Sequence, residues 1–154
     1  VNSKKSGRIN LVVRNLQKKI AVNPKGIKNI ILKTIFFEKV KKNAEITVSF
    51  LNDRKIKELN LRFLGKNAPT DVLAFDISEP SRPNNIFADI VISTDTAIRN
   101  SRIFKTTALY ELRLYVIHGL LHILGYDDRT KKDKIIMHNK EEFLLKSLNL
   151  FPIT

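Results

Sequence analysis

The chain has 154 residues, of which 43% are hydrophobic and 28% are charged, and it contains only five Gly and five Pro. This composition excludes disordered and fibrous classes and predicts a single globular domain over residues 1–154. Because the chain has no cysteine, disulfides and thiolate metal sites are excluded, and any metal must be held by His, Asp, Glu or water.

Strands and helices alternate in the first half of the predicted structure. β-Branched residues and a period-2 alternation predict strands over residues 9–13 and 46–50. Apolar residues at helical spacing predict a helix from Pro24 to Val40. A second helix is predicted from Asn52 to Gly65, and each of these helices has an asparagine as its N-cap.

The second half of the chain is predicted to begin with a hairpin and to continue with helices only. Strands over residues 72–77 and 86–93 are joined by a turn-rich loop with two prolines. The helices that follow are predicted at 95–102, 107–124 and 131–148. The predicted fold class is therefore α/β, a small mixed and mostly parallel four-stranded sheet with helices packed on its faces.

Positive charge dominates the composition, since 28 Lys and Arg against 15 Asp and Glu give a formal net charge of +13. Such an excess favours a nucleic-acid partner, because neutralising phosphates releases counterions. The alternative is a basic surface that only aids solubility.

The N-terminus has no apolar run, and the apolar stretch Leu114–Leu124 is too short to span a membrane. A cytoplasmic protein without a membrane partner is expected.

The segment that carries chemistry is Tyr-Val-Ile-His-Gly-Leu-Leu-His-Ile-Leu-Gly-Tyr-Asp-Asp, residues 115–128. On a helix, His118 and His122 lie on one face with their Cβ atoms about 5–6 Å apart. Gly125 suits the end of that helix, after which the chain can return Asp128 as a third ligand. Two imidazoles and one carboxylate leave a fourth position for water, as in catalytic zinc sites. The alternative is a pair of core histidines.

The residue after the first histidine separates two reaction classes. Peptidases with the His-Glu-x-x-His motif use that glutamate as a general base, but this chain has Gly119 there. Peptide hydrolysis is therefore the weaker hypothesis. No general base is evident, so the catalytic residues stay unassigned. His138 lies among lysines of the last predicted helix and is expected at the surface.

The histidine segment resembles the YbeY family of bacterial ribosomal RNA maturation factors, which are described as single-strand-specific endoribonucleases. The family pattern His-Gly-x-Leu-His-x-x-Gly-Tyr-Asp-His is matched by His118, Gly119, Leu121, His122, Gly125, Tyr126 and Asp127. Two further stretches fit the family, one within residues 59–75 and one over residues 88–93. The resemblance covers most of the chain between residues 46 and 128.

This resemblance implies an α/β fold with a zinc-like ion at the long helix. It also implies a role in maturing small-subunit ribosomal RNA and in ribosome quality control, with contact to the ribosome or its assembly factors. Asp128 stands where the family usually has a third histidine ligand, and this harder ligand weakens the preference for zinc. Leu64 stands where the family commonly has an arginine suited to phosphate. Arg62 and Lys66 are the nearest cations and are the predicted RNA contacts.

The leading functional hypothesis is an endoribonuclease in which a basic surface gathers RNA and one divalent metal activates a water; the resemblance implies that this metal is zinc. One alternative is an RNA- or ribosome-binding assembly factor with a structural metal and little nuclease activity. Another is a metallopeptidase-like hydrolase.

The roles of two aspartates near the predicted site each have two interpretations. Thr70-Asp71 forms a turn or contacts substrate, and Asp127 orients a ligand histidine or bonds its own turn.

Overall fold

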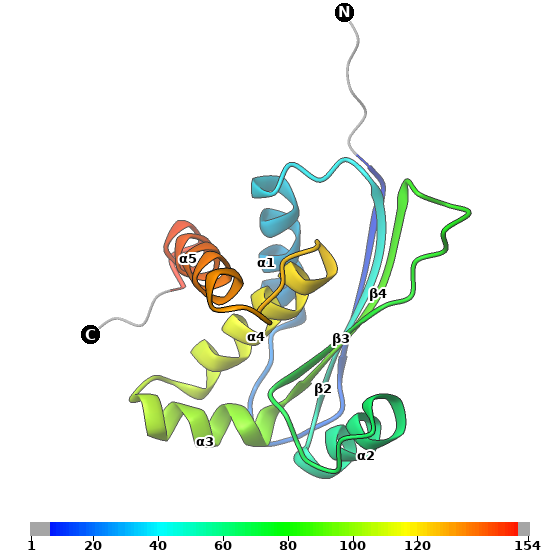
Figure 1. The fold of residues 1–154 in the computed structure, drawn as a ribbon. Helices are drawn as coiled ribbons and strands as arrows, with labels where there is room; N and C mark the ends of the chain where they lie inside the picture. Colours follow the sequence, from blue (N-terminus) through cyan, green and yellow to red (C-terminus); the bar gives the residue numbers. More distant parts are fainter. Residues whose placement is uncertain (1–6, 151–154) are drawn as a thin grey trace, which may run out of the picture.

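The computed structural model describes residues 7–150, which form four strands and five helices. The elements are β1 (Ile9–Asn15), α1 (Pro24–Phe37), β2 (Asn43–Leu51), α2 (Asp53–Leu64), β3 (Val72–Asp76), β4 (Asn85–Ser93), α3 (Thr94–Phe104), α4 (Ala108–Ile123) and α5 (Lys131–Ser147). The sheet order is β1-β2-β4-β3, with β3 antiparallel to β4 and the other pairs parallel. The predicted mixed α/β fold is therefore confirmed (Figure 1).

The ends of the first two helices follow from local chemistry. Asn23 and Asn52 each accept a backbone N–H of the first turn, at 3.1 and 3.0 Å, and Gly65 ends α2 with a φ of +69°. The predicted end of α1 at Val40 is wrong, because the helix stops at Phe37. Lys39 adopts a left-handed φ of +54° and turns the chain away from the helix axis.

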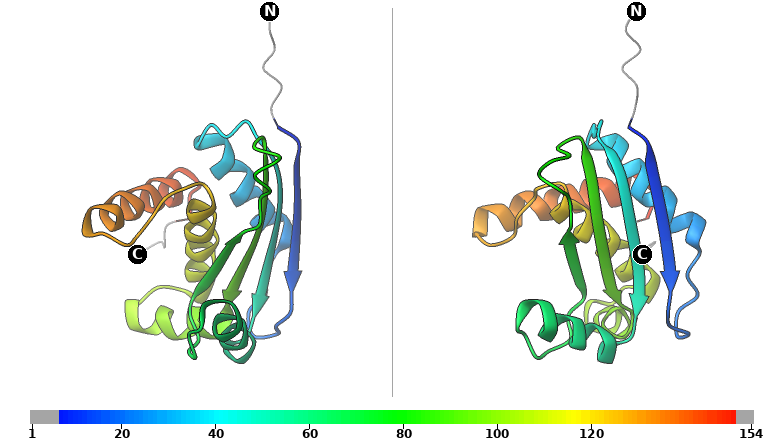
Figure 2. Two further views of the ribbon diagram at one scale, coloured as in Figure 1. Left: turned by 45° about the vertical axis from the view of Figure 1, so that its right-hand side comes forward. Right: turned by 90° about the vertical axis from the view of Figure 1, so that its right-hand side faces the viewer.

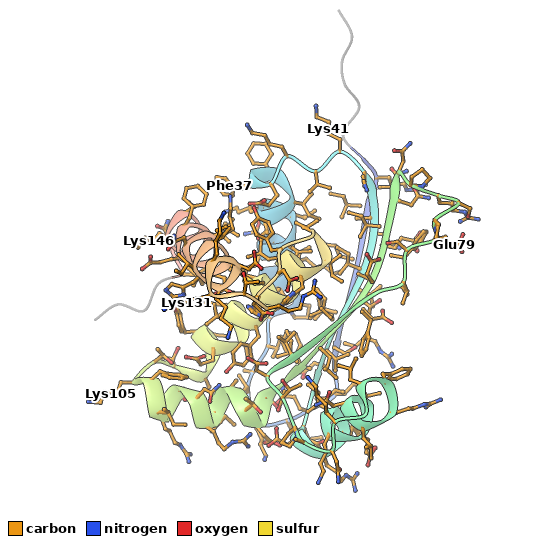
Figure 3. All side chains as sticks on the ribbon, in the orientation of Figure 1. Phe37, Lys41, Glu79, Lys105, Lys131 and Lys146 are labelled. Carbon is orange, nitrogen blue, oxygen red and sulfur yellow. The ribbon has the colours of Figure 1, made fainter. Side chains whose placement is uncertain are left out.

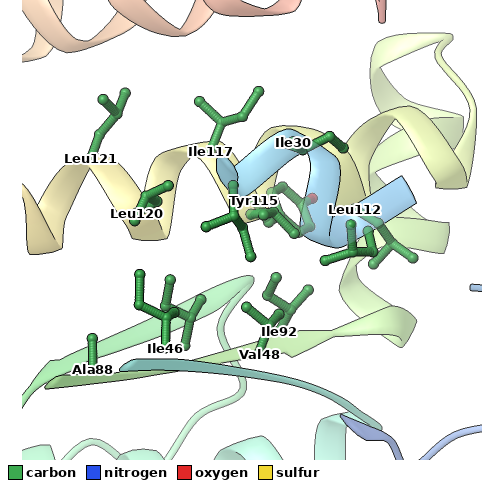
Figure 4. Packing of buried hydrophobic residues seen from close by; sticks show 14 of the residues in the cluster. Ile30, Ile46, Val48, Ala88, Ile92, Leu112, Tyr115, Ile117, Leu120 and Leu121 are labelled. Atoms are coloured by element: carbon green, nitrogen blue, oxygen red, sulfur yellow. The ribbon is translucent and has the colours of Figure 1, made fainter. Parts of the chain in front are cut away.

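The main core lies between one face of the sheet and the helices α1 and α4, with α5 packed on α4 (Figure 2). Ile46, Val48 and Ile92 project from the strands toward α4 (Figure 4). They meet Leu112 and Leu120, and all five side chains are at most 2% exposed. Within residues 7–150, no helix has the length and apolar character needed to cross a membrane.

Helix α2 covers part of the opposite face, where Ile56 packs in a smaller cluster of buried apolar residues. Asp53 at the start of α2 joins it to α3. Its Oδ1 accepts hydrogen bonds from Ser93 Oγ at 2.6 Å and Thr96 Oγ1 at 3.0 Å, and its Oδ2 pairs with Arg99. Burial acts to raise the pKa of Asp53, but these contacts lower it below its ordinary value. We refer to these contacts as the Asp53 network.

Candidate metal centre

The three side chains that the sequence predicts as metal ligands come together at the C-terminal end of α4. His118, His122 and Asp128 each offer one ligand atom, and these atoms lie within 4.8 Å of one another. The two Nε2 atoms of the histidines are 3.0 Å apart. Asp128 Oδ2 lies 3.7 Å from the Nε2 of His118 and 3.5 Å from that of His122. All three residues are partly exposed, so this triad is reachable from solvent.

The donor set of the triad fits a divalent metal ion. Imidazole nitrogen and carboxylate oxygen are ligands that zinc accepts, with bonds of about 2.0–2.2 Å. Tetrahedral bonds of that length place neighbouring ligand atoms about 3.3–3.6 Å apart. The separations of 3.0, 3.5 and 3.7 Å bracket this spacing. One ion could therefore contact all three atoms after small movements of the side chains.

Glu141 of α5 contacts His118 from the side opposite the triad, and the sequence analysis did not identify it. Its Oε1 lies at hydrogen-bonding distance from His118 Nδ1. An ionised carboxylate only accepts, so Nδ1 carries the proton and Nε2 keeps the lone pair that a metal ligand requires. Burial acts to lower the pKa of His118, but the bond to Glu141 and the charges of Asp71 and Asp128 raise it above its ordinary value.

The sequence does contain a signal for Glu141. It shares a face of α5 with Met137, Leu144 and Leu145, which are at most 2% exposed. The spacing i, i+4, i+7, i+8 is that of an apolar core stripe, and Glu141 occupies one of its positions. A carboxylate in such a stripe requires a polar partner, because burying it alone is costly. His118 is that partner.

Gly119 lies between the two histidines in sequence and faces the sheet. A Cβ at this position would lie 2.8 Å from Ile90 Cγ2 and 3.0 Å from Val72 Cγ2. Helix α4 therefore packs unusually close to β3 and β4, which brings His118 near the start of β3. A glutamate at position 119 would point into this contact instead of toward the triad. The peptidase hypothesis thus loses its general base for geometric as well as chemical reasons.

The loop after α4 returns to the helix and is fastened there. Gly125 has a φ of +101°, a left-handed conformation that glycine adopts at low cost. The hydroxyl of Tyr126 donates to Glu38 Oε2 at 2.7 Å, and Lys140 Nζ lies 3.0 Å from Glu38 Oε1. These contacts tie the loop to the end of α1 and to α5, and so hold Asp128 near the histidines.

The two acidic positions with open interpretations both form hydrogen bonds within their own turns. Asp127 Oδ1 accepts from the backbone N–H of Asp128 at 2.8 Å and of Arg129 at 3.1 Å. Its Oδ2 accepts from Arg129 Nε at 2.6 Å. Asp71 Oδ1 accepts from the next backbone N–H at 2.7 Å and from the Thr70 hydroxyl at 3.1 Å. The carboxylate that orients a histidine is Glu141 of α5.

The predicted RNA contacts lie on and just after α2, whereas the triad lies on and after α4. Arg62 on α2 and Lys66 just after it are both exposed. The guanidinium carbon of Arg62 lies 5.4 Å from the centre of the Phe63 ring. Leu64, at the position where the related family commonly has arginine, is 53% exposed. His138 is exposed on α5, as expected for a surface histidine.

Comparison with known proteins places the chain in a family. The family model described as "Endoribonuclease YbeY" matches residues 12–149. A protein of that name from Syntrophus aciditrophicus (strain SB) is 35% identical over 148 residues, covering 93% of this chain and 92% of the relative. Another from Thermoanaerobacter sp. (strain X514) is 32% identical over 157 residues, covering 92% and 99%.

A solved structure has a similar fold. The solution structure of TM1509 from Thermotoga maritima matches with a TM-score of 0.59 and 28% sequence identity, covering 91% of this chain and 88% of that protein. The family match spans nearly all of the described residues, including every element that builds the triad. The chain therefore belongs to the endoribonuclease YbeY family.

Proposed function

We propose that this protein is a metal-dependent, single-strand-specific endoribonuclease that matures small-subunit ribosomal RNA and serves ribosome quality control in the cytoplasm. The ribosome or its assembly factors are the proposed partners. The observation that carries the proposal is the triad of His118, His122 and Asp128, whose ligand atoms lie within 4.8 Å of one another. The family and the net charge of +13 support RNA as the substrate.

Each part of the site has a distinct task in this proposal. A divalent ion at the triad, zinc in our proposal, would polarise a phosphoryl oxygen and lower the pKa of a water. Glu141 keeps the ring of His118 oriented with its Nε2 unprotonated. The loop fastened through Tyr126 holds Asp128 in place. Arg62 and Lys66 are exposed cations that we assign to phosphates of the RNA outside the triad.

Histidine replacement tests the ligand assignment. His118→Ala and His122→Ala should each abolish stoichiometric zinc binding, measured by elemental analysis, and chelator-sensitive cleavage of single-stranded RNA. His138→Ala is the matched control, because this exposed histidine does not belong to the triad, and it should keep both properties. Full metal occupancy in either triad variant would show that the histidines only pack in the core.

Substitutions at Asp128 and at the neighbouring Asp127 test the assignment of the third ligand. Asp128→Ala should sharply reduce metal affinity, whereas Asp127→Ala should act only through the turn that Asp127 stabilises. Asp128→His should restore binding and shift the preference toward zinc over manganese or magnesium, because imidazole is a softer ligand than carboxylate. Competitive metal titrations measure all three. An Asp128→Ala protein that binds metal like the parent would refute the assignment.

Substrate class is tested by comparing single-stranded RNA, duplex RNA and a peptide. Cleavage of the single strand that requires metal, with little cleavage of the duplex, supports the proposal. Stoichiometric metal without cleavage of any RNA would instead indicate an assembly factor with a structural metal. Metal-dependent hydrolysis of the peptide would refute the nuclease assignment.

A further inference from the structure

A hollow lies beside the segment that follows α1. It has a volume of about 800 Å³ and is bordered by the segment after α1, the loop between β3 and β4, and the end of α4. Ile123 and Leu124, which directly follow His122, form part of its wall. The hollow therefore reaches the C-terminal end of α4, the helix that carries the two histidines, and its wall holds no residue of the triad.

Three lysines on one short segment border this hollow. Lys39, Lys41 and Lys42 are exposed, and we call them the lysine segment. Among the residues that the structure describes, no ion pair joins any of the three to an acidic side chain. Figure 3 shows Lys41 at the same end of the molecule as Glu79, which borders the hollow from the β3–β4 loop. Ammonium groups on neighbouring residues that form no ion pair repel one another and favour an anionic ligand.

The acidic groups of the wall are already engaged. Glu38 pairs with Lys140 and accepts from Tyr126. Glu79 lies 3.4 Å from the guanidinium of Arg82. Asp76 is exposed and accepts the backbone N–H of Ser78 at 2.9 Å. Glu38 and Glu79 are thus paired with cations outside the lysine segment, whereas Asp76, which accepts a backbone N–H, keeps its negative charge.

A second hollow of about 560 Å³ continues from the first. The two share Arg82, Asn85 and Ile86 in their walls, and the second adds Arg8. Its surface also holds Asn43, whose amide donates to Asn85 Oδ1 at 3.0 Å. The two hollows form one path, which is lined by five lysines and arginines, by amides and by four carboxylates, of which Glu45 borders the second hollow.

We propose that this path binds the sugar-phosphate backbone of single-stranded RNA, with the lysine segment contacting phosphates beyond the end of α4. The inference rests on the proposed endoribonuclease function and adds the route by which the strand leaves the site. Lysine is a mobile point charge that contacts phosphate without reading sequence. The path therefore gives affinity and direction to the strand, and no base specificity.

The experiment removes the lysine segment and compares the result with an equal loss of charge elsewhere. The test variant is Lys39→Asn with Lys41→Gln and Lys42→Gln, because asparagine tolerates the left-handed φ of +54° at position 39. The control variant carries Lys18→Gln, Lys25→Gln and Lys28→Gln, all exposed and located before or at the start of α1. The probe is an oligo-uridine of about twelve 2′-O-methyl nucleotides, which resists cleavage.

The test variant should bind the probe about 100-fold more weakly than the parent near 0.1 M salt. Each lost phosphate contact makes the plot of log K against log salt shallower by about 0.7. Three lost contacts therefore reduce log K by about 2 near 0.1 M salt, which is about 100-fold. The control variant should weaken binding by no more than about threefold. Thermal unfolding should be unchanged in both, since all six lysines are exposed.

Two outcomes overturn the inference: equal losses in the two variants, or affinity like the parent in the test variant. The metal content and the RNA cleavage of the parent are measured as well. These measurements distinguish failure of this inference from failure of the proposed function. If the parent cleaves RNA and the lysine segment does not affect binding, the inference fails and the function stands. If the segment binds the probe and the parent does not cleave, the proposed function fails and the binding path stands.

Discussion

The contact between α4 and the sheet makes Gly119→Ala the most discriminating test of the packing that positions the triad. The added methyl would lie 2.8 Å from Ile90 Cγ2 and 3.0 Å from Val72 Cγ2, so these atoms must move by about 0.4–0.6 Å to reach ordinary contact. Both are branch methyls next to the backbone, and Ile90 is fully buried. Overpacking of this kind costs about 1–3 kcal/mol, which exceeds the gain of about 1 kcal/mol from replacing glycine in a helix.

The difference between this cost and this gain leads us to expect that Gly119→Ala lowers the free energy of unfolding by up to about 2 kcal/mol and the Tm by up to roughly 8 °C. Gly26→Ala in α1 is the matched control. The nearest atom to its added methyl lies 3.8 Å away, so it should stabilise the protein by up to about 1 kcal/mol.

Urea unfolding of Gly119→Ala, Ile90→Ala and the double variant completes the test. The smaller side chain at position 90 relieves the clash, so the double variant should be more stable than the sum of the single effects predicts, by about 1 kcal/mol or more. If Gly119→Ala stabilises the protein as Gly26→Ala does, and the two sites show no coupling, the close packing of α4 is refuted.

Three further predictions concern groups that support the site or the fold. Glu141→Leu keeps the apolar stripe of α5 but removes the acceptor for His118, so metal affinity in competition titrations should fall roughly 10–100-fold; unchanged affinity would contradict the orienting role. Tyr126→Phe leaves Glu38 without its hydroxyl donor and should cost about 1–2 kcal/mol in urea unfolding, whereas an unchanged midpoint would exclude the fastening of the loop. The folded-state pKa of Asp53 is lowered, so its stabilisation is present above about pH 4 and is lost as the pH falls further. Asp53→Asn should thus cost about 1–2 kcal/mol near pH 7 and much less near pH 2–3, and a difference independent of pH would argue against an ionised Asp53 network.

Local chemistry along the chain determined most of the secondary structure and the order of the elements. The period-2 and helical patterns, the asparagine caps and the hairpin after residue 72 depend on neighbours within a few positions. The geometry of the triad also follows from short-range rules. His118 and His122 share a helix face because they are four residues apart, and Gly125 lets the chain return Asp128 to that face.

Only the tertiary structure decided which residues surround the triad. Glu141 lies 23 positions from His118 and meets it because α5 packs on α4. Glu38 lies 88 positions from Tyr126. Such contacts depend on how the helices pack in space, and no local periodicity encodes that arrangement. The same limit applies to Lys39 and Lys42, whose charge in the sequence indicated only a solvated surface, whereas the folded chain places them at the border of a hollow.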